Sequence, residues 1–373
     1  MSHHVPPARF ARDPHGGMEP GPGWFALPFG DASFRGIPGH AYTALDRRAR
    51  WQRYGFALDV LSPGVANGKY HSETYADESF VVIDGDVDAI VEGRVVEMTA
   101  GDMLHCPAGT AHILAGAGDA HSIVAMLGTR GVDPPGADWG VYVPDPVAAR
   151  YGASVAERTP DPRVAYADRP EYAPVPRPRR WGCGGGGRPG AREPAGTATF
   201  TQRDDGRLVR TGDGWFVLSV DRMAWSDNGR VCRVRTDDDV RFTQYGVNVR
   251  TLRPGWPSSM YHREFDDDET MVVLDGACVA VVEGSAIALD AGTMLHLPAG
   301  TAHVTVGAGT VPCTVLMVGS RRAAGTDAWG EYVPDPEAAR LGAAVAERTT
   351  DPRVAYADEP PFSPSAPLWT FRA

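Results

Sequence analysis

Short runs of alternating apolar and polar residues, separated by turns rich in Gly, Asp and Pro, fill both halves of the sequence. In the first half these runs lie at 56–61, 79–83, 88–93, 94–98, 102–107 and 121–127. Their counterparts in the second half lie at 247–252, 270–274, 278–284, 286–290, 293–298 and 313–319. A period of two is typical of β-strands, because successive side chains point to opposite faces. Since no helical pattern intervenes, we predict an all-β fold, either an antiparallel barrel or a sandwich.

The predicted strands belong to a duplicated unit. The run ESFVVIDG, which ends at Gly85, returns as ETMVVLDG, which ends at Gly276, so the offset is 276 − 85 = 191 residues. The same offset relates Trp24 to Trp215. Because this period is far longer than that of any solenoid repeat, we predict two copies of a whole domain.

The stretch between the two copies, residues 176–196, is rich in Pro and Gly and shows no periodic apolar face, which is typical of a linker. The first 20 residues lack the apolar core of a signal peptide and are interpreted as a disordered leader. We therefore predict a leader at 1–20, an N-terminal domain at 21–175, a linker at 176–196 and a C-terminal domain at 197–373.

A short helical arm is expected after each predicted barrel. Asp145-Pro146 and Asp335-Pro336 precede Ala-rich segments, and Asp favours the cap and Pro the first turn of a helix. The segment 139–168 matches 329–358 at 25 of 30 positions, more closely than 71–112 matches 262–303, which agree at 23 of 42 positions. We expect each arm to pack on the opposite barrel. The alternative is a lid over each site, with these residues touching the substrate: Trp139, Arg163, Tyr166, Trp329, Arg353 and Tyr356.

Charge and composition restrict the functional classes. The chain has 36 basic and 47 acidic residues, so its net charge of −11 disfavours binding to nucleic acid. No apolar run reaches the ~20 residues that a membrane span requires. Five Cys without a CxxC pair favour a reducing compartment, so we expect a cytoplasmic protein that acts on a small molecule. Whether it forms a homo-oligomer is left open.

Both copies carry His and Glu residues at the same spacing. His71 and Glu73 are two residues apart on one strand and face the same side, Glu78 opens the next strand, and His112 follows a Pro-Ala-Gly turn. The second copy repeats this set as His262, Glu264, Glu269 and His303. Two imidazoles with one or two carboxylates suit Fe(II), Mn(II), Co(II), Ni(II) or Zn(II), so we predict one divalent metal ion in each copy.

At these positions the sequence resembles the cupin superfamily. The first cupin motif is matched by His71, Glu73, Glu78 and Gly85, and the second by Gly101, Pro107, Gly109 and His112. The second copy matches both motifs again, in the same order. The chain looks like a bicupin, the two-domain form shared by oxalate decarboxylases and several dioxygenases. This resemblance implies two tandem jelly-roll β-barrels with short helical arms.

One position departs from the cupin pattern, because the second ligand is usually His and is Glu in both copies. Glu73 and Glu264 either bind the metal or stand off it as general bases or hydrogen-bond partners of the ligands. Without Glu73, the residues His71, Glu78 and His112 still form the two-His, one-carboxylate triad of non-haem Fe(II) oxygenases.

Further residues recur near the predicted sites. His105 and His296 precede the Pro-Ala-Gly turns, and we expect them to form hydrogen bonds within the sheet rather than to act as acids or bases. Tyr70 and Tyr261 are expected to be packing residues. We interpret Lys69 as a solvated loop residue, with binding of a substrate carboxylate as the alternative.

These features favour a metal-dependent oxidoreductase, a non-haem Fe(II) dioxygenase that uses O2 on a small polar or carboxylated metabolite. The alternatives are a Mn-dependent lyase of the oxalate decarboxylase type, a metal-dependent isomerase or hydrolase, and a non-catalytic binding cupin. Because the neighbours of the ligands differ between copies, we expect one barrel to carry most of the turnover. Ser72, Thr74 and Lys69 favour the first copy.

Overall fold

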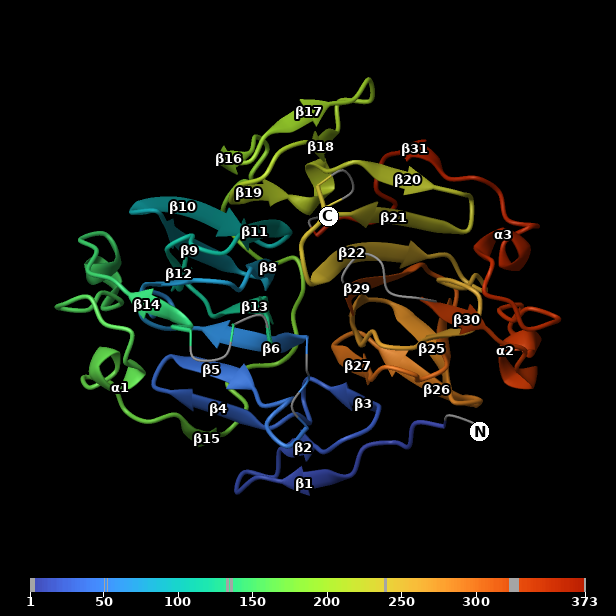
Figure 1. Cartoon of the computed structure of the whole chain (residues 1–373), viewed down its shortest axis with the longest axis horizontal. Coiled ribbons are helices and arrows are strands. Elements are labelled where there is room, and N and C mark those ends of the chain that lie inside the picture. The colour runs from blue at the N-terminus through green and yellow to red at the C-terminus, as the bar shows by residue number, and fades with distance from the viewer. Residues whose placement is uncertain are drawn as a thin grey trace.

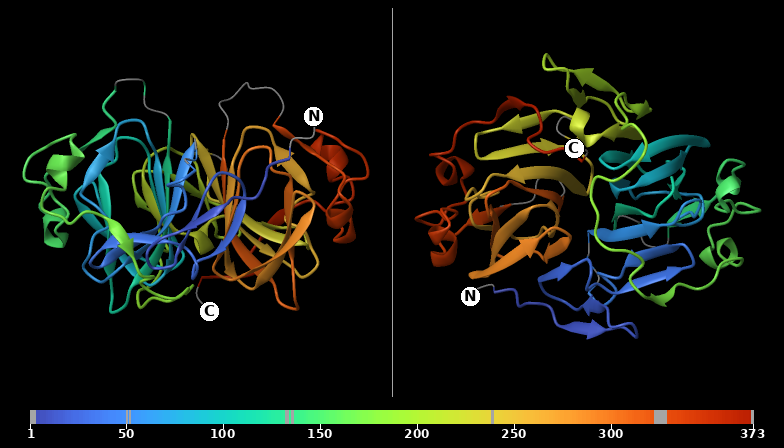
Figure 2. Two further views of the ribbon diagram at one scale, coloured as in Figure 1. Left: turned by 90° about the horizontal axis from the view of Figure 1, so that it is seen from below. Right: turned by 180° about the vertical axis from the view of Figure 1, so that it is seen from behind.

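The computed structural model describes residues 4–49, 51, 53–131, 134, 137–237, 240–321 and 329–371. Each half of the chain forms a jelly roll in which a five-stranded sheet faces a larger one, and the two jelly rolls lie side by side (Figures 1 and 2). We call them the N-terminal and C-terminal barrels. The all-β prediction with two jelly rolls is confirmed, and each barrel consists of two facing sheets rather than one continuous ladder. Among the described residues, no helix is long and apolar enough to span a membrane.

The five-stranded sheets have equivalent strand orders in the two barrels. In the N-terminal barrel the order is β10 (Arg94–Thr99), β9 (Asp86–Val91), β12 (His112–Ala117), β7 (His71–Glu73) and β14 (Gly140–Tyr142). In the C-terminal barrel it is β26 (Ser285–Asp290), β25 (Ala277–Val282), β28 (His303–Gly307), β23 (His262–Glu264) and β30 (Gly330–Tyr332).

The larger sheets also correspond strand by strand, except that β16 of the N-terminal barrel has no counterpart among the described strands of the C-terminal barrel. The N-terminal barrel has the order β15 (Ala173–Val175), β4 (Phe34–Ile37), β5 (His40–Thr43), β6 (Tyr54–Leu61), β13 (Ser122–Thr129), β8 (Glu78–Asp84), β11 (Asp102–Cys106), β19 (Phe216–Ser219) and β16 (Ala195–Gly196). The C-terminal barrel has the order β31 (Ser363–Ser365), β20 (Trp225–Asp227), β21 (Val231–Arg235), β22 (Tyr245–Leu252), β29 (Cys313–Ser320), β24 (Glu269–Asp275), β27 (Thr293–Leu297) and β3 (Phe25–Pro28).

The two halves exchange one strand reciprocally. Strand β3, from the first half, pairs with β27 of the C-terminal barrel, and β19, its counterpart 191 residues later, pairs with β11 of the N-terminal barrel. Each exchanged strand covers an edge that would otherwise expose unpaired backbone groups. The barrels therefore do not coincide in space with the predicted segments 21–175 and 197–373, because a strand of each segment completes the other barrel.

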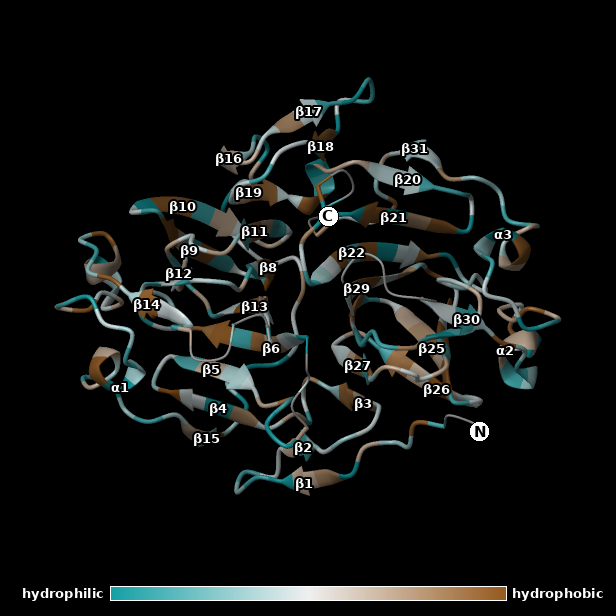
Figure 3. Cartoon of the chain, viewed as in Figure 1, coloured by the Kyte–Doolittle hydropathy of each residue, from teal (hydrophilic) through white to brown (hydrophobic). Residues whose placement is uncertain are grey.

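One hydrophobic core joins the barrels. It includes Phe25, Tyr54, Phe216, Trp225 and Tyr245, which come from both halves and are almost completely buried. Smaller apolar clusters fill the interior of each barrel. Figure 3 shows the apolar residues on the strands of both barrels and polar residues on the connecting loops. Since burial of apolar area is the main stabilising contribution, we expect the two barrels to depend on each other for stability.

The two segments predicted as leader (1–20) and linker (176–196) are ordered where the structure describes them. Within 1–20, strands β1 (Phe10–Arg12) and β2 (Met18–Pro20) form a hairpin, whose turn is closed by backbone N–H donors on the Asp13 carboxylate. Strands β17 (Phe200–Gln202) and β18 (Leu208–Arg210) form the corresponding hairpin of the second half. In the linker, the backbone N–H of Gly185 donates to Asp84 Oδ1 at 2.6 Å. Glycine allows this approach, because a Cβ on Gly185 would lie 2.5 Å from the same carboxylate oxygen of Asp84.

The helical arms are shorter than predicted and lie on their own barrels. The Ala-rich segments form only η1 (Ala148–Tyr151) and α2 (Pro336–Arg340), and the first ends at Gly152 in the left-handed conformation. Helices α1 (Pro162–Ala165) and α3 (Pro352–Ala355) follow these segments. The short helix η2 (Val220–Arg222) lies elsewhere, between strands β19 and β20 in the sequence. Strand β14 pairs with β7, and β30 with β23, so each arm is tied to the barrel that precedes it. The expectation that each arm packs on the opposite barrel is therefore wrong.

Candidate metal sites

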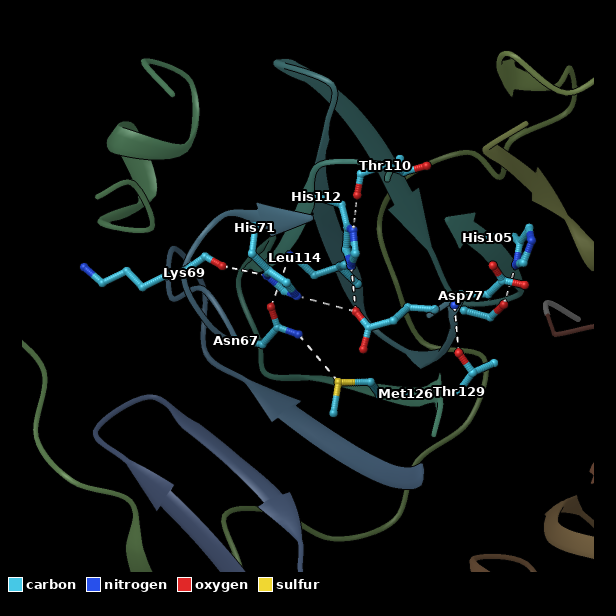
Figure 4. Close-up of polar contacts among 12 residues, drawn as sticks. Asn67, Lys69, His71, Asp77, His105, Thr110, His112, Leu114, Met126 and Thr129 are labelled. Atoms are coloured by element: carbon cyan, nitrogen blue, oxygen red, sulfur yellow. Dashed lines mark hydrogen bonds and ion pairs between the residues drawn. The ribbon is translucent and has the colours of Figure 1, made fainter. Parts of the chain in front are cut away.

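Three side chains converge inside the N-terminal barrel. His71 begins β7, Glu78 begins β8 and His112 begins β12, and their ligand atoms all lie within 4.8 Å of one another. The Nε2 atom of His112 is 2.7 Å from Oε2 of Glu78, and that of His71 is 3.8 Å from the same oxygen. Figure 4 shows the two imidazoles turned toward each other from neighbouring strands.

The C-terminal barrel repeats this arrangement. His262, Glu269 and His303 form the corresponding group, again within 4.8 Å. The Nε2 atom of His303 lies 2.6 Å from Oε2 of Glu269, and the two imidazole centroids are 4.6 Å apart. His262 and His303 face each other across the β23–β28 pair, as their counterparts do in the first barrel.

Backbone carbonyls determine how the four imidazoles are protonated. The Nδ1 atoms of His71, His112, His262 and His303 lie 2.8, 2.9, 2.8 and 3.0 Å from the backbone oxygens of the residues two positions earlier. A carbonyl oxygen can only accept, so each Nδ1 carries the proton and donates. The Nε2 atom is then free to present a lone pair to the centre of the group, as a metal-binding imidazole requires.

The donor set fits a divalent cation. In both barrels an Nε2 lone pair lies within 2.7 Å of a carboxylate oxygen, and two such lone pairs repel unless a cation lies between them. Two ligand atoms bound to one ion at ~2.1 Å are ~3.0 Å apart at right angles and ~4.2 Å apart when opposite, a range close to the distances found here. Two neutral imidazoles and one carboxylate suit Fe(II) and its neighbours in the first transition series.

When no metal is bound, a proton on His112 lies between this imidazole and the carboxylate of Glu78 in the N-terminal group. Burial opposes the charged form of His112, but Cys106 and Glu78 outweigh it and raise its pKa well above the usual range. Burial alone would raise the pKa of Glu78, whereas the hydrogen bond from His112 and the imidazole charges lower it. Burial and the charge of His112 lower the pKa of His71. One imidazole is thus kept neutral while the other holds the proton.

The C-terminal group has similar electrostatics. Burial, followed by the charge of His303, lowers the pKa of His262 to about 4. The carboxyl of Glu269 is buried, which opposes ionisation, but the hydrogen bond and charge of His303 bring its pKa down to about 2. A carboxylate that stays ionised beside a neutral imidazole is ready to bind a metal ion at neutral pH.

Glu73 and Glu264 lie outside the two groups of three ligands. Their backbone oxygens accept hydrogen bonds from Gly109 and Gly300 at 2.6 Å each, which ties the Pro-Ala-Gly turns to the strands of the first ligands. Both residues line the cavities next to the ligand groups. Their role as metal ligands or as general bases therefore stays a prediction.

The two ligand groups open onto cavities that differ in volume and in the residues that line them. The C-terminal cavity has a volume of about 500 Å³ and is lined by His262, Glu269 and His303. The N-terminal cavity is about 320 Å³ and reaches the group through Glu78. Trp329 and Tyr356 line the C-terminal cavity, so two residues of the proposed lid are placed where a substrate would lie.

Other predicted neighbours lie away from the ligands. Arg163 and Arg353 point into solvent and pair with Asp161 and Asp351, so they do not face the cavities. Lys69 is buried rather than solvated, and its Nζ lies 2.8 Å from Asp168 Oδ2 and points away from His71 (Figure 4).

The two tyrosines next to the first ligands are packing residues, as predicted. The Tyr70 hydroxyl accepts a hydrogen bond from the backbone N–H of Gly93 at 2.9 Å, and that of Tyr261 accepts one from Gly284 at 3.0 Å. Both rings are almost completely buried.

His105 and His296 lie at the junction of the two barrels. Ser79 and Thr270 bind their Nδ1 atoms at 2.8 and 3.0 Å within the sheet, as predicted. The Tyr54 hydroxyl then reaches Thr270 from the other barrel at 2.8 Å.

Sequence reasoning missed the arginines of the C-terminal cavity, Arg233, Arg235 and Arg250. The 191-residue offset relates them to Tyr42, Ala44 and Asp59. This replacement of neutral or acidic residues by arginines is present in the sequence, but only a comparison of the inward-facing strand positions of both copies would have found it.

Comparison with known proteins identifies the type of domain in each barrel. The family model of the cupin domain matches residues 57–127 and 248–319, one match in each barrel. The chain thus contains two cupin domains, as predicted. No curated protein sequence matches the chain.

Several solved structures are similar to the chain. The protein Ylba from E. coli is 13% identical, with 85% of this chain and 96% of that chain covered and a TM-score of 0.49. The oxalate decarboxylase of Lactobacillus farciminis in its formate complex is 14% identical, with coverages of 80% and 86% and a TM-score of 0.49. The oxalate decarboxylase of Bacillus subtilis at pH 4.6 is 16% identical, with coverages of 79% and 75% and a TM-score of 0.47.

Proposed function

We propose that this bicupin is a metal-dependent enzyme, a non-haem Fe(II) dioxygenase that acts on a small polar or carboxylated metabolite. The observation that carries the proposal is the group of two imidazoles and one carboxylate that opens onto a cavity of about 500 Å³ in the C-terminal barrel. Three protein ligands leave coordination positions for a substrate and O2, which is the arrangement that non-haem Fe(II) oxygenases use. A closed four-ligand site would favour a structural metal instead.

The protein residues would bind and orient the substrate. His262, Glu269 and His303 would hold Fe(II), which when bound supplies a Lewis acid and electrons for the reduction of O2. The carbonyls behind the Nδ1 atoms fix the orientation of the imidazoles. Glu264 lines the same cavity and is the candidate to accept a proton from the substrate. Trp329 and Tyr332 line the cavity beside His262, with ring centroids 6.0 Å from its imidazole, and would form the apolar part of the substrate site.

Anaerobic loading followed by oxygen uptake tests the proposal. Protein loaded with Fe(II) should bind about two equivalents per chain, and a panel of small hydroxy, keto and aromatic acids should include one that drives O2 uptake. Protein loaded with Zn(II) is the control, because the same ligands hold an ion that cannot exchange electrons. Turnover of a panel member without net O2 uptake, such as release of CO2, would contradict the dioxygenase and favour a lyase.

A further inference from the structure

Equivalent strand positions in the two barrels carry opposite charges. Asp59 on β6 lies opposite Val124, and Arg250 on β22 lies opposite Val315 in the same register. The pairs correspond at the 191-residue offset, so the two side chains occupy the same place relative to the ligands. The metal ligands are the same in both copies, whereas this wall position changes from an anion to a cation.

Arg250 is set into the C-terminal cavity beside the ligands. Its Nη1 donates to the backbone oxygen of Ser258 at 2.8 Å, while its buried Nε has no hydrogen-bond partner among the described residues. It lines the same cavity as His262 and Glu269. A buried guanidinium N–H without a partner is costly, and a carboxylate from a ligand is the partner that it binds most strongly.

The C-terminal cavity holds charges of both signs besides Arg250: Glu269 and Glu264 favour the charged form of Arg250, whereas Arg235 opposes it. Arg235 lines the cavity too, and the guanidinium of Arg233 stacks on Phe362 at 3.5 Å from the ring centroid. Among the acidic residues of the wall, Glu359 lies 3.7 Å from Arg230. Glu269 is bonded to His303.

The corresponding place in the N-terminal barrel holds a buried carboxylate, whose Oδ1 atom has no hydrogen-bond partner among the described residues. Asp59 is 1% exposed and lies 3.4 Å from both His40 Nε2 and Asn67 Nδ2. Asn67 lies beside His71 and also approaches the Met126 sulfur, which lines the N-terminal cavity (Figure 4). A buried carboxylate close to this cavity opposes the entry of a second anion.

We infer that only the C-terminal barrel binds the carboxylate of the substrate, and that Arg250 is the residue that anchors it. The inference rests on the proposed function for the identity of the bound molecule as a substrate. It also reverses the expectation from Ser72, Thr74 and Lys69 that the first copy takes the substrate, because Lys69 is bound to Asp168 and does not reach the cavity. The N-terminal barrel, with Asp59 in that place, would keep its metal group without binding the carboxylate.

Calorimetric titration with malonate tests this assignment. The protein is loaded with Zn(II), so that no turnover occurs, and malonamide serves as the neutral probe of the same size. Malonate should bind once per chain. Arg250→Gln should weaken malonate about 30-fold or more, the cost of removing one partner of a desolvated charge pair, and should leave malonamide unchanged. Arg253→Gln is the matched control, because Arg253 follows the same strand and pairs with Asp227 outside the cavity.

Two results would overturn the inference: equal binding of two malonates per chain, or unchanged malonate affinity in Arg250→Gln. If Arg250→Gln loses its near-ultraviolet circular dichroism, Arg250→Lys replaces it, and this variant should weaken malonate several-fold because Lys cannot form the two parallel hydrogen bonds. Unchanged affinity in Arg250→Lys would equally overturn the inference. Failure of O2 uptake with Fe(II) would contradict the proposed function alone, since malonate binding to the Zn(II) protein does not depend on redox chemistry.

Discussion

The junction of the barrels should make the protein less stable in mild acid, and His296 is one residue responsible. Its imidazole is buried, stacks on Trp51 with ring centroids 3.8 Å apart and an angle of 9°, and bonds to Thr270 at 3.0 Å. Burial lowers its pKa to about 3. The unfolded chain binds a proton at an ordinary pKa of about 6.5, so between these two values the unfolded state holds more protons than the folded state.

The size and sign of the effect follow from this difference. The stability contributed by neutral His296 is complete above pH ~6.5 and is lost as the pH falls toward 3, because protonation then favours the unfolded chain. Between pH 7 and pH 5, a shift from about 6.5 to about 3 costs about 2 kcal/mol of unfolding free energy. Burial also lowers the pKa of His105 well below its usual range, so this histidine acts in the same direction.

Urea unfolding of wild type and His296→Asn at pH 7 and pH 5 measures this contribution. Asn places a polar atom near the position of Nδ1 but does not titrate. The variant should lose about 0.5–1.5 kcal/mol at both pH values from the missing ring stack. Its further loss between pH 7 and pH 5 should be smaller than that of wild type by about 2 kcal/mol. Equal pH dependence in the two proteins would refute the reasoning, because every other titrating group is shared.

Three further predictions concern the ligands and the junction. His112→Ala and His303→Ala should each remove about one metal equivalent, measured by elemental analysis after loading, and loss of both ions from one substitution would show that the sites depend on each other for folding. Glu73→Gln and Glu264→Gln should keep two metal equivalents, because these residues lie outside the ligand groups, and a loss in the same analysis would make them ligands. Tyr54→Phe should lower the free energy of unfolding in urea by about 1–2 kcal/mol, because it removes the 2.8 Å hydrogen bond to Thr270. The control Tyr75→Phe, at an exposed position, should change this free energy by less than ~0.5 kcal/mol. Equal effects of the two substitutions would show that the hydrogen bond contributes nothing.

The repeat, the strands and the ligand groups could be predicted because each depends on short-range sequence pattern. Alternation of apolar residues determines which face of a strand is buried, and His71, Glu78 and His112 begin strands β7, β8 and β12, which lie in the two facing sheets. The prediction that His105 and His296 form hydrogen bonds within the sheet was confirmed. The contact of His296 with Trp51 of the first half was not predictable, since these two residues are far apart in the sequence.

The strand exchange could not be read from the sequence for a physical reason. Strand β3 has the same alternating pattern whether it pairs with its own barrel or with the other one, because both edges present the same hydrogen-bonding groups. The Gly-rich linker was misleading in a similar way. Glycine is typical of flexible linkers, yet Gly184 and Gly186 are needed here because a Cβ would collide with Phe371 and Thr99.

The exchange also explains how two equal ligand groups can exist in unequal barrels. Because β3 and β19 each complete the other half, neither barrel can lose its strands without exposing the shared core, so both must keep their fold. The inward positions away from that core are under no such constraint. Asp59 and Arg250 occupy one of these positions, and the change of charge there alters what the cavity can bind without changing the sheet. Such a molecule can retain a second metal group for its contribution to stability while one cavity specialises in an anionic ligand.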